Sequence, residues 1–594
     1  MCGIVGYIGD KQAHQILLNC LEKLEYRGYD SCGIAIASDD IKVIKDTIRV
    51  KAMADSSPRL EGTAGIGHTR WATHGPPSQI NAHPQIDCPG NIAVVHNGII
   101  NNYQELKDLL IEEGHNFVSE TDTEVLSHLI EKYYKGNLEE ATEAALKKVE
   151  GSYTIIVIAK GEPKLVVARK DSPLIIGLGD RENFIASDVP AILDYTDRVI
   201  YLEDGDIGAI TSNEIKIKRN GAEIKPDEQK VMWTVEEAQK SGYEHFLLKE
   251  IHETPKVIRN TLAEYTREME PVADLAGMKE EGVESVLMIA TGTSYYAVLT
   301  GKYIIEELLG IPVRVEISSE FNYYSHTLAK TVAIAICQSG ETADTLKAMK
   351  KLREAGCRVI VISNVVGSTA TRIANQTIYT RAGPEISVAA SKTFTAQLMV
   401  LYWLAMSHSK GDSRRVASLL LELRQLPNKA QQVLDNESQI MEQAKFLSRF
   451  ENAFFVGRGI NYPIALEGAL KLKEISYIHA EGYAAGETKH GPYALLGPNT
   501  PVIALAARDN TYEPLMNNLK QIKARGSPII ALAEEGDTVI EEVADYIIPV
   551  PRVDTLFSPV VNVIALQLLA YYTAKERGCP IDNPRHLAKT LTVE

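Results

Sequence analysis

The chain has 594 residues, of which 45% are hydrophobic and 24% charged, a composition typical of a globular protein. This length exceeds what one hydrophobic core usually supports, so we expect several domains. Acidic residues outnumber basic residues by 78 to 62, and the net charge is −16 at pH 7. The charge therefore argues against nucleic acid or an anionic membrane surface as a partner.

Apolar runs in the sequence are short. The longest strongly apolar run, 398–406, falls well below the ~20 residues that cross a bilayer, so we predict no membrane span. The first residues have neither the basic nor the apolar region of a signal peptide. The seven cysteines contain no C-x-x-C pair, which is typical of reduced thiols and not of a zinc ribbon. We therefore expect a cytoplasmic protein without a bound metal or cofactor.

The N-terminal segment carries the first candidate catalytic group. Cys2 stands where removal of the initiator methionine would make it the first residue. Its own α-amine, with a pKa near ~8, could then accept the thiol proton and activate the nucleophile. The apolar segment 4–8 predicts a strand that holds this terminus in place. Up to about residue 220, short β-prone runs alternate with turns and a few helices, which predicts stacked sheets with flanking helices.

Polar segments farther along this half are candidates for ligand binding. The loop 65–75 contains Arg70, a side chain that suits a carboxylate. A predicted strand breaks at Asn97-Gly98; this pair usually indicates a tight turn, yet its amide groups could also form an oxyanion hole. Asp122 opens an amphipathic helix. A capping box explains part of that helix start and leaves the Asp122 carboxylate for an ammonium group.

Four motifs of this half, in this order, resemble the class II glutamine amidotransferase family, whose members are N-terminal-nucleophile hydrolases with an αββα sandwich fold. The motifs are Cys2-Gly3-Ile4, residues 68–75, residues 96–98 and residues 120–124. The resemblance implies that Cys2 attacks the side-chain amide of glutamine and forms a thioester as ammonia leaves. It also implies that Arg70 binds the glutamine carboxylate and Asp122 its ammonium, that Thr73, His74 and Gly98 line the pocket, and that Asn97 and Gly98 stabilise the oxyanion.

The histidines of this half leave a metal site open as an alternative. They are His68, His74, His83 and His96. We disfavour this alternative because thiol chemistry requires no metal and because these spacings match no common zinc pattern.

Beyond the polar stretch 218–244, which indicates a domain boundary, the chain repeats itself. Gly292 and Gly459 stand 167 positions apart, as do Tyr295 and Tyr462. Each copy places a β-prone run before a glycine turn and a helix, which predicts two doubly wound parallel-sheet domains. The predicted division is 1–220 for the first domain, 221–246 for a linker, 247–430 and 431–580 for the two repeated domains, and 581–594 for a catalytic tail.

Hydroxyl side chains gather after two buried strands of the first copy. Thr293 and Ser294 follow one strand, and Ser339 and Thr342 follow another. Helix capping would explain one such loop, but two of them favour a phosphate site at the carboxyl ends of the strands. The second copy has Asn461 at the matching place, so we predict that its phosphate site is lost.

These features resemble the sugar isomerase domain family, and the whole chain resembles the isomerising aminotransferases that use glutamine and fructose 6-phosphate. The resemblance implies that Lys589 forms a Schiff base with the sugar, that His490 helps to open its ring, and that Glu474 moves the proton that turns ketose into aldose. It further implies that Gln338, Val388, Lys471 and Ala588 contact the sugar phosphate, that Trp71 gates an internal ammonia channel, and that the protein is a homodimer.

The sequence departs from this family pattern at two places near the expected sugar site. Cys337 stands where serine is usual, and Ala390-Ser391 stands where Ser-Thr is expected. We expect these two differences to alter the affinity for the sugar before they alter the chemistry of the reaction. Two rival functions remain: a class II amidotransferase with another acceptor, against which the doubled second half argues, and a non-catalytic sugar-phosphate sensor. A sensor would have no need of Cys2, Glu474 and Lys589 together.

Overall fold

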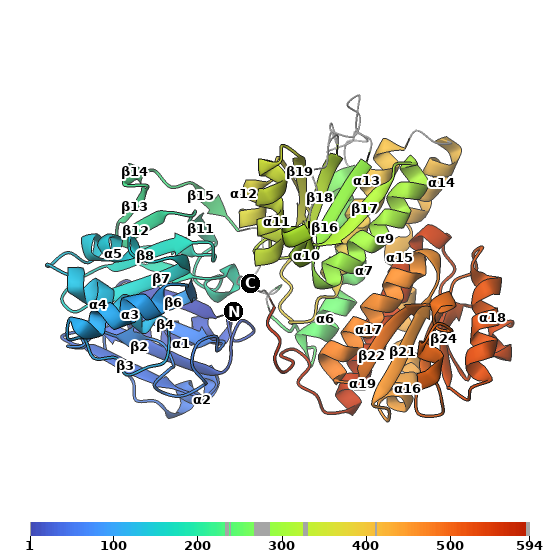
Figure 1. The fold of residues 1–594 in the computed structure, drawn as a ribbon, viewed down its shortest axis with the longest axis horizontal. Helices are drawn as coiled ribbons and strands as arrows, with labels where there is room; N and C mark the ends of the chain where they lie inside the picture. The colour runs from blue at the N-terminus through green and yellow to red at the C-terminus, as the bar shows by residue number, and fades with distance from the viewer. Residues whose placement is uncertain are drawn as a thin grey trace. The chain divides into compact units, whose positions relative to one another are not determined.

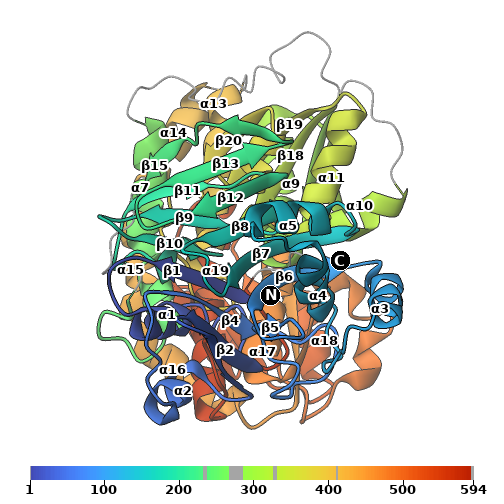
Figure 2. The same ribbon diagram turned by 90° about the vertical axis from the view of Figure 1, so that its left-hand side faces the viewer.

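The computed structural model describes residues 2–231, 237, 239–266, 285–324, 331–409 and 413–589. The chain divides into two compact units (Figures 1 and 2). The first unit is Met1–Ala238 with the short segments 341–343 and 588–594, and the second is 239–340 with 344–587. Parts of the predicted linker and the last five residues of the predicted tail lie outside the described residues.

Two antiparallel sheets form the centre of the first unit. Their strand orders are β15-β11-β9-β10-β1-β4-β2-β3 and β14-β13-β12-β8-β7-β6-β5. The strands are β1 (Gly3–Ile8), β2 (Ser31–Ala37), β3 (Ile41–Asp46), β4 (Ala64–Arg70), β5 (Gln85–Ile86), β6 (Ile92–Ile100), β7 (Gly151–Ala159), β8 (Leu165–Lys170), β9 (Ile175–Leu178), β10 (Asn183–Ala186), β11 (Arg198–Tyr201), β12 (Asp206–Ile210), β13 (Ile215–Arg219), β14 (Ala222–Ile224) and β15 (Glu228–Lys230). The last two strands lie within 221–246, the range predicted as linker.

Helices cover the outer face of each sheet. They are α1 (Ala13–Glu22), α2 (Val50–Ser56), α3 (Tyr103–Glu112), α4 (Glu124–Tyr133) and α5 (Leu138–Leu146). Helix α1 packs on β1 and β4, whereas α4 packs on β6 and α5 on β8. Successive residues of β6 point to opposite faces: Val94 belongs to the core under the helices, and Val95 to the core between the sheets. The predicted αββα sandwich is confirmed.

The second unit contains two parallel five-stranded sheets with the same topology, ordered β17-β16-β18-β19-β20 and β22-β21-β23-β24-β25. The first sheet has β16 (Ser285–Ala290), β17 (Val313–Ile317), β18 (Thr331–Cys337), β19 (Arg358–Ser363) and β20 (Gln376–Tyr379). The second has β21 (Asn452–Gly457), β22 (His479–Ala484), β23 (Val502–Ala506), β24 (Ile529–Glu534) and β25 (Tyr546–Val550). In each sheet the chain starts at the second position and later crosses over it, so both are doubly wound, as predicted.

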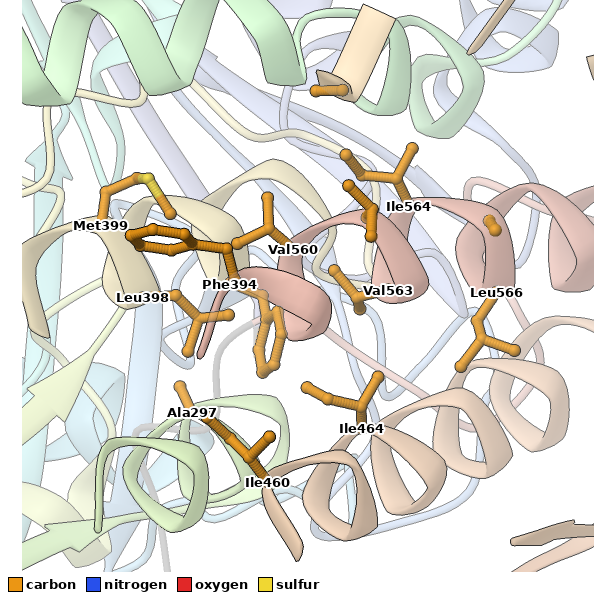
Figure 3. Close-up of a cluster of buried hydrophobic side chains, with 14 of the residues drawn as sticks. Ala297, Phe394, Leu398, Met399, Ile460, Ile464, Val560, Val563, Ile564 and Leu566 are labelled. Carbon is orange, nitrogen blue, oxygen red and sulfur yellow. The ribbon is translucent and has the colours of Figure 1, made fainter. Parts of the chain in front are cut away.

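The helices around these sheets are α6 (Phe246–His252), α7 (Thr254–Thr266), α9 (Gly292–Leu309), α10 (Ser318–Tyr324), α11 (Ala343–Glu354), α12 (Thr369–Ile373), α13 (Lys392–His408), α14 (Ser413–Leu423), α15 (Leu426–Asp435), α16 (Glu437–Leu447), α17 (Tyr462–Ser476), α18 (Tyr512–Lys523) and α19 (Ser558–Glu576). Four of them, α9, α13, α17 and α19, pack together between the sheets. Figure 3 shows Phe394 and Leu398 of α13 beside Ile464 of α17 and Val560 of α19. The two repeated domains therefore share one central core.

One helix of this core is apolar along its whole length. Among the described residues, only Thr555–Glu576 is long and apolar enough to cross a membrane, and 94% of its apolar window is buried inside the protein. An amphipathic surface helix has one apolar stripe, but a helix packed on all sides is apolar all round. The neighbours of α19, which include α16 and α17, account for its composition.

Candidate active sites

Cys2 lies directly before β1, against the segment that follows β4. Its Sγ accepts a hydrogen bond from the Trp71 N–H at 3.2 Å, and its carbonyl accepts one from Asn97 Nδ2 at 2.9 Å. The next residue, Gly3, donates its N–H to Thr69 Oγ1 at 3.2 Å. Burial raises the pKa of the Cys2 thiol. Because the thiol is then protonated at neutral pH, its chemistry requires a nearby base.

Strand β6 continues through Asn97 and Gly98, so the predicted break at this pair is wrong. Both residues pair with β7 in register, opposite Thr154 and Tyr153, and the strand ends only at Ile100. Gly98 has φ 137°, and a Cβ there would lie 2.1 Å from the Ser152 carbonyl oxygen. Only glycine fits, because a side chain would clash with the neighbouring strand. The strand places the Asn97 amide next to Cys2.

The two residues predicted to bind the glutamine backbone are both buried. Arg70, the last residue of β4, is 3% exposed and donates to the carbonyl groups of His74 and of Gly75, the latter at 2.9 Å. Asp122 is 4% exposed and accepts the Ile100 N–H at 2.9 Å. The loop and the strand end thus hold both charges in fixed positions. Burial lowers the pKa of Arg70.

The other residues of the predicted loop are more accessible. Trp71 is half-buried, with its ring edge-on to Tyr29 at 5.6 Å between centroids. His74 is half-buried and packs edge-on to Tyr103 at 5.2 Å, while Thr73 is exposed. This loop is therefore ordered around Arg70 yet keeps side chains at the surface of the unit.

The remaining histidines form a buried network under this site. His68 Nε2 contacts the His96 carbonyl oxygen at 3.0 Å and His83 Nδ1 at 3.1 Å. His96 Nδ1 contacts Thr123 Oγ1 at 2.8 Å. Burial lowers the pKa of His68 to about 3, so its ring is neutral at pH 7. The network connects β4 and β6 to the start of α4.

Three residues that support this site had no role assigned from the sequence. Thr69 and Thr123 bond as described above, and Asp30 accepts the Ala72 N–H at 2.9 Å. Their partners are distant in sequence, and the strand pairing alone brings Thr69 opposite Gly3. A prediction of the register of β1 on β4 would have found Thr69.

The hydroxyl-rich segments that follow two strands lie at one edge of the first parallel sheet. Residues 291–294, which include the first residues of α9, follow β16, and the loop 338–342 follows β18; these strands are neighbours. From β16 the chain goes first to one side and then to the other, so this edge is the topological switch point where such sheets bind ligands. Thr293 and Ser294 lie in the first turn of α9, and Gln338, Ser339 and Thr342 lie in the loop after β18.

A helix of the second repeated domain contributes a lysine to this edge. Lys471 of α17 donates to Thr293 Oγ1 at 2.9 Å. Its Nζ lies 2.6 Å from Glu474 Oε2 and 3.5 Å from Glu467 Oε1. Gln397 Nε2 of α13 donates to Ser294 Oγ at 3.0 Å. The structure thus joins four predicted residues, Thr293, Ser294, Lys471 and Glu474, with Glu467 and Gln397, to which the sequence assigned no role.

The charges of this cluster are strongly perturbed. Burial raises the pKa of Glu467, which is fully buried, to about 8 in spite of the nearby lysine. Burial also opposes the charged form of Lys471, but the carboxylates of Glu467 and Glu474 outweigh it and raise the pKa of this amine. Lys471 therefore remains an ammonium group that orients Glu474 and Thr293.

The contacts described for this cluster do not include four other predicted sugar-site residues. His490 is exposed, and its ring makes no hydrogen bond to Lys471 or Glu474 among the described contacts. Val388 is half-buried, and its N–H donates to the Asp582 carbonyl at 3.1 Å. Ala588 and Lys589 are half-buried and group with the first unit. The roles of these four residues stay predictions.

The matching edge of the second sheet is closed by internal hydrogen bonds. Asn461 Nδ2 donates to Ser558 Oγ at 2.9 Å, and Arg458 Nη2 donates to Asn518 Oδ1 at 2.9 Å. Side chains that would face a ligand here are bonded to the protein instead. The absence of a phosphate site in the second copy stays a prediction.

The two departures from the family pattern lie in well-packed positions. Cys337 is the last residue of β18 and is buried. The Ser391 N–H donates to Glu385 Oε1 at 2.9 Å, as does the Thr393 N–H at 3.1 Å. Glu385 thereby caps the start of α13 without a contribution from the side chain of the neighbouring Ala390.

Comparisons with known proteins agree with both halves of this arrangement. The glutamine amidotransferase domain family matches residues 68–194, and the SIS domain family matches 282–407 and 446–577. Relatives named glutamine–fructose-6-phosphate aminotransferase [isomerizing], from Caldanaerobacter subterraneus subsp. tengcongensis and from Methanosarcina acetivorans, are each 48% identical over 100% of both chains. The C-terminal domain of glucosamine-fructose-6-phosphate aminotransferase from Francisella tularensis has a TM-score of 0.56 and 36% identity, and covers 58% of this chain and 100% of that one.

The sandwich with its N-terminal cysteine and the two doubly wound sheets define a glutamine amidotransferase joined to a pair of sugar isomerase domains. The identity to its relatives extends over the full length of the chain. The chain belongs to the glutamine–fructose-6-phosphate aminotransferase (isomerising) family.

Proposed function

We propose that this protein transfers the amide nitrogen of glutamine to fructose 6-phosphate and isomerises the product, giving glucosamine 6-phosphate and glutamate. The observation that carries the proposal is the cluster of Thr293, Lys471 and Glu474 at the switch point of a sugar isomerase sheet. A chain with the Cys2 site alone would fit any glutamine amidotransferase. The second cluster supports a sugar phosphate as the acceptor.

In the first unit, Cys2 acts as the nucleophile. With Met1 removed, its α-amine accepts the thiol proton while Sγ attacks the carboxamide carbon of glutamine. Asn97 and the Gly98 N–H stabilise the oxyanion, and Arg70 and Asp122 hold the α-carboxylate and α-ammonium groups. Ammonia leaves, and water then hydrolyses the thioester to glutamate. Thr73 and His74 line the pocket, and Trp71 gates the route of ammonia.

At the sugar site, the phosphate binds the hydroxyls and backbone N–H groups of the segments that follow β16 and β18. Lys589 forms the imine with the sugar, and His490 assists ring opening. Glu474 moves the proton that converts the ketose into the aldose. Lys471, 2.6 Å from Glu474, orients this carboxylate as a base. Gln338, Val388 and Ala588 complete the contacts to the sugar phosphate.

We further propose that the enzyme is a cytoplasmic homodimer that binds neither nucleic acid nor membranes. The net charge of −16 supports the last two points. Light scattering should then give a molar mass of about twice that of the 65.4 kDa chain, and a monomer in the active sample would contradict the dimer.

A product assay with separate variants of the two sites tests the function. Wild-type protein should form glucosamine 6-phosphate from glutamine and fructose 6-phosphate. Cys2→Ala should abolish glutamine hydrolysis, whereas Glu474→Gln should abolish the amino sugar and keep glutamine hydrolysis. A wild-type protein that hydrolyses glutamine but aminates only another acceptor would support the first rival function. Binding of fructose 6-phosphate without any turnover would support the sensor.

A further inference from the structure

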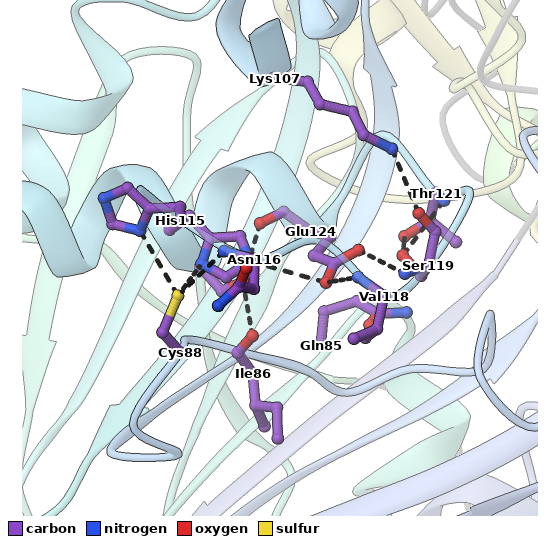
Figure 4. Close-up of polar contacts among 12 residues, drawn as sticks. Gln85, Ile86, Cys88, Lys107, His115, Asn116, Val118, Ser119, Thr121 and Glu124 are labelled. Carbon is purple, nitrogen blue, oxygen red and sulfur yellow. Dashed lines mark hydrogen bonds and ion pairs between the residues drawn. The ribbon is translucent and has the colours of Figure 1, made fainter. Parts of the chain in front are cut away.

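Four side chains of the first unit that have no part in the proposed chemistry converge on one point. They are Cys88, His115, His128 and Glu131, and their sulfur, nitrogen and oxygen atoms all lie within 4.8 Å of one another. Cys88 lies in the turn between β5 and β6, His115 follows α3, and His128 and Glu131 lie one turn apart on α4. Figure 4 shows Cys88 and His115 directed toward each other. Three separate segments of the chain therefore meet here.

Four of the six distances between these atoms match the edges of a tetrahedral zinc site. Cys88 Sγ lies 3.5 Å from His128 Nδ1 and 3.7 Å from His115 Nδ1. Glu131 Oε2 lies 3.1 Å from His115 Nδ1 and 3.3 Å from His128 Nδ1. Usual bond lengths of zinc to sulfur, nitrogen and oxygen place S and N about 3.6 Å apart and N and O about 3.3 Å apart in a tetrahedron.

The surroundings of the cluster resemble those of bound metals. The Asn116 N–H points at Cys88 Sγ at 3.4 Å, as a donor to a thiolate does. His128 is 1% exposed in its side chain, and its other ring nitrogen, Nε2, lies 3.6 Å from Glu124 Oε1 without a hydrogen-bond partner. Histidine ligands usually present their second nitrogen to a carboxylate in this way. Glu124 is itself held by the N–H groups of Val118 and Ser119 at 2.8 and 2.6 Å (Figure 4).

We propose that Cys88, His115, His128 and Glu131 bind one Zn²⁺ ion. One thiolate, two neutral imidazoles and one carboxylate form a donor set that zinc accepts, and four protein ligands leave no position for substrate, so the site is structural. The site fixes the turn before β6, the strand of Asn97 and Gly98, to α4, which starts two residues after Asp122. The metal would thereby brace the glutamine pocket without entering the reaction. The spacing of these ligands matches no short motif, so the sequence predicted no metal.

The alternative is a metal-free network in which both imidazoles donate to Glu131 or Cys88. The zinc content of the purified protein distinguishes the zinc site from this metal-free network. Untagged protein, equilibrated with zinc and dialysed, should retain about one zinc per chain by mass spectrometry. Cys88→Ser, at an exposed position that tolerates the change, and Glu131→Gln should weaken zinc binding more than about 100-fold in competition with a fluorescent chelator, because even outer-shell changes cost 10- to 100-fold.

Controls come from the second unit: Cys579→Ser and the exposed His479→Ala should bind zinc as the wild type does. Cobalt added to metal-free wild type should give the sulfur-to-cobalt charge-transfer absorption, which Cys88→Ser should lack. Zinc removal should also lower the unfolding temperature of the first unit. Wild type without tightly bound zinc, or zinc bound equally well by Cys88→Ser and Glu131→Gln, would overturn the proposal in favour of the hydrogen-bond network.

Discussion

At the scale of single residues, the buried charges around Lys471 determine how the sugar site responds to pH. Glu467 is fully buried, lies 3.5 Å from the Lys471 amine and accepts a hydrogen bond from Thr293 Oγ1 at 3.2 Å. Glu474 lies closer to the same amine and is more accessible. Because Glu467 is mainly protonated at pH 7, Lys471 pairs chiefly with Glu474. Glu474 is thus the carboxylate that Lys471 orients.

The raised pKa of Glu467 predicts that the stability of the folded protein depends on pH. Burial raises the pKa of Glu467 from the usual 4.5 to about 8 in the folded protein, whereas the unfolded chain ionises near the usual value. The unfolded state therefore binds fewer protons between these pH values, and the contribution of Glu467 to stability is lost as pH rises through about 8. Glu467→Gln should remove this loss, so its unfolding temperature should gain on that of wild type from about pH 5 to about pH 8.

Scanning calorimetry of the second unit's transition at several pH values measures this difference. Glu541→Gln, at an exposed position, is the matched control and should follow the wild type. Parallel curves for wild type and Glu467→Gln would show that Glu467 is ionised in the folded protein at neutral pH.

The backbone conformation at Gly98 predicts the effect of a substitution at this position. Gly98→Ala would place a methyl group against the Ser152 carbonyl oxygen in a left-handed conformation, and would displace β6 from β7 next to Asn97. Glutamine hydrolysis should fall by about tenfold or more, which corresponds to about 1.4 kcal/mol or more in the barrier. The cluster of Thr293, Lys471 and Glu474 belongs to the other unit, so fructose 6-phosphate should bind as before by calorimetry. Unchanged glutaminase kinetics of Gly98→Ala would show that glutamine hydrolysis does not depend on the position of β6 at Gly98.

At the scale of elements, the loop after β18 should hold the phosphate. Ser339→Ala combined with Thr342→Ala removes two hydroxyl donors, and hydrogen bonds to a charged group contribute ~1.5 to 3 kcal/mol each. Affinity for fructose 6-phosphate should therefore fall roughly tenfold or more, with glutamine hydrolysis intact. Asn461→Ala, at the matching place of the second sheet, is the control and should leave the affinity unchanged. Equal affinities for the wild type and the double variant would rule out this loop as the phosphate site.

The elements also show what the sequence can and cannot specify. The strands β16 and β18 were predictable because parallel strands buried on both faces form continuous apolar runs before glycine turns. The turn signal at Asn97-Gly98 failed because pairing with β7 holds the strand straight through it. The contact between Lys471 and Thr293 joins residues 178 positions apart and depends on how the two sheets pack. No local pattern carries that information.

At the scale of the whole molecule, each unit has its own core, and the second unit's core is shared by both repeated sheets. The predicted catalyst of imine formation, Lys589, lies in the tail that follows this core. The full chain incubated with fructose 6-phosphate and then reduced with borohydride should carry a hexitol phosphate on the peptide of Lys589. Lys589→Arg keeps the charge but cannot form the imine, and should carry none. An adduct on Lys471 or Lys473 instead would reassign the role.

Transfer of nitrogen from one unit to the other is the central claim, and isotope labelling tests it most directly. The full chain is given fructose 6-phosphate, glutamine labelled with nitrogen-15 in its amide group, and an excess of unlabelled ammonium. Mass spectrometry then measures the label in glucosamine 6-phosphate. If ammonia released at Cys2 is delivered internally, the product should carry nitrogen-15 in spite of the unlabelled pool, and Cys2→Ala should give no labelled product. Unlabelled product from wild type, or labelled ammonium without any amino sugar, would contradict the account.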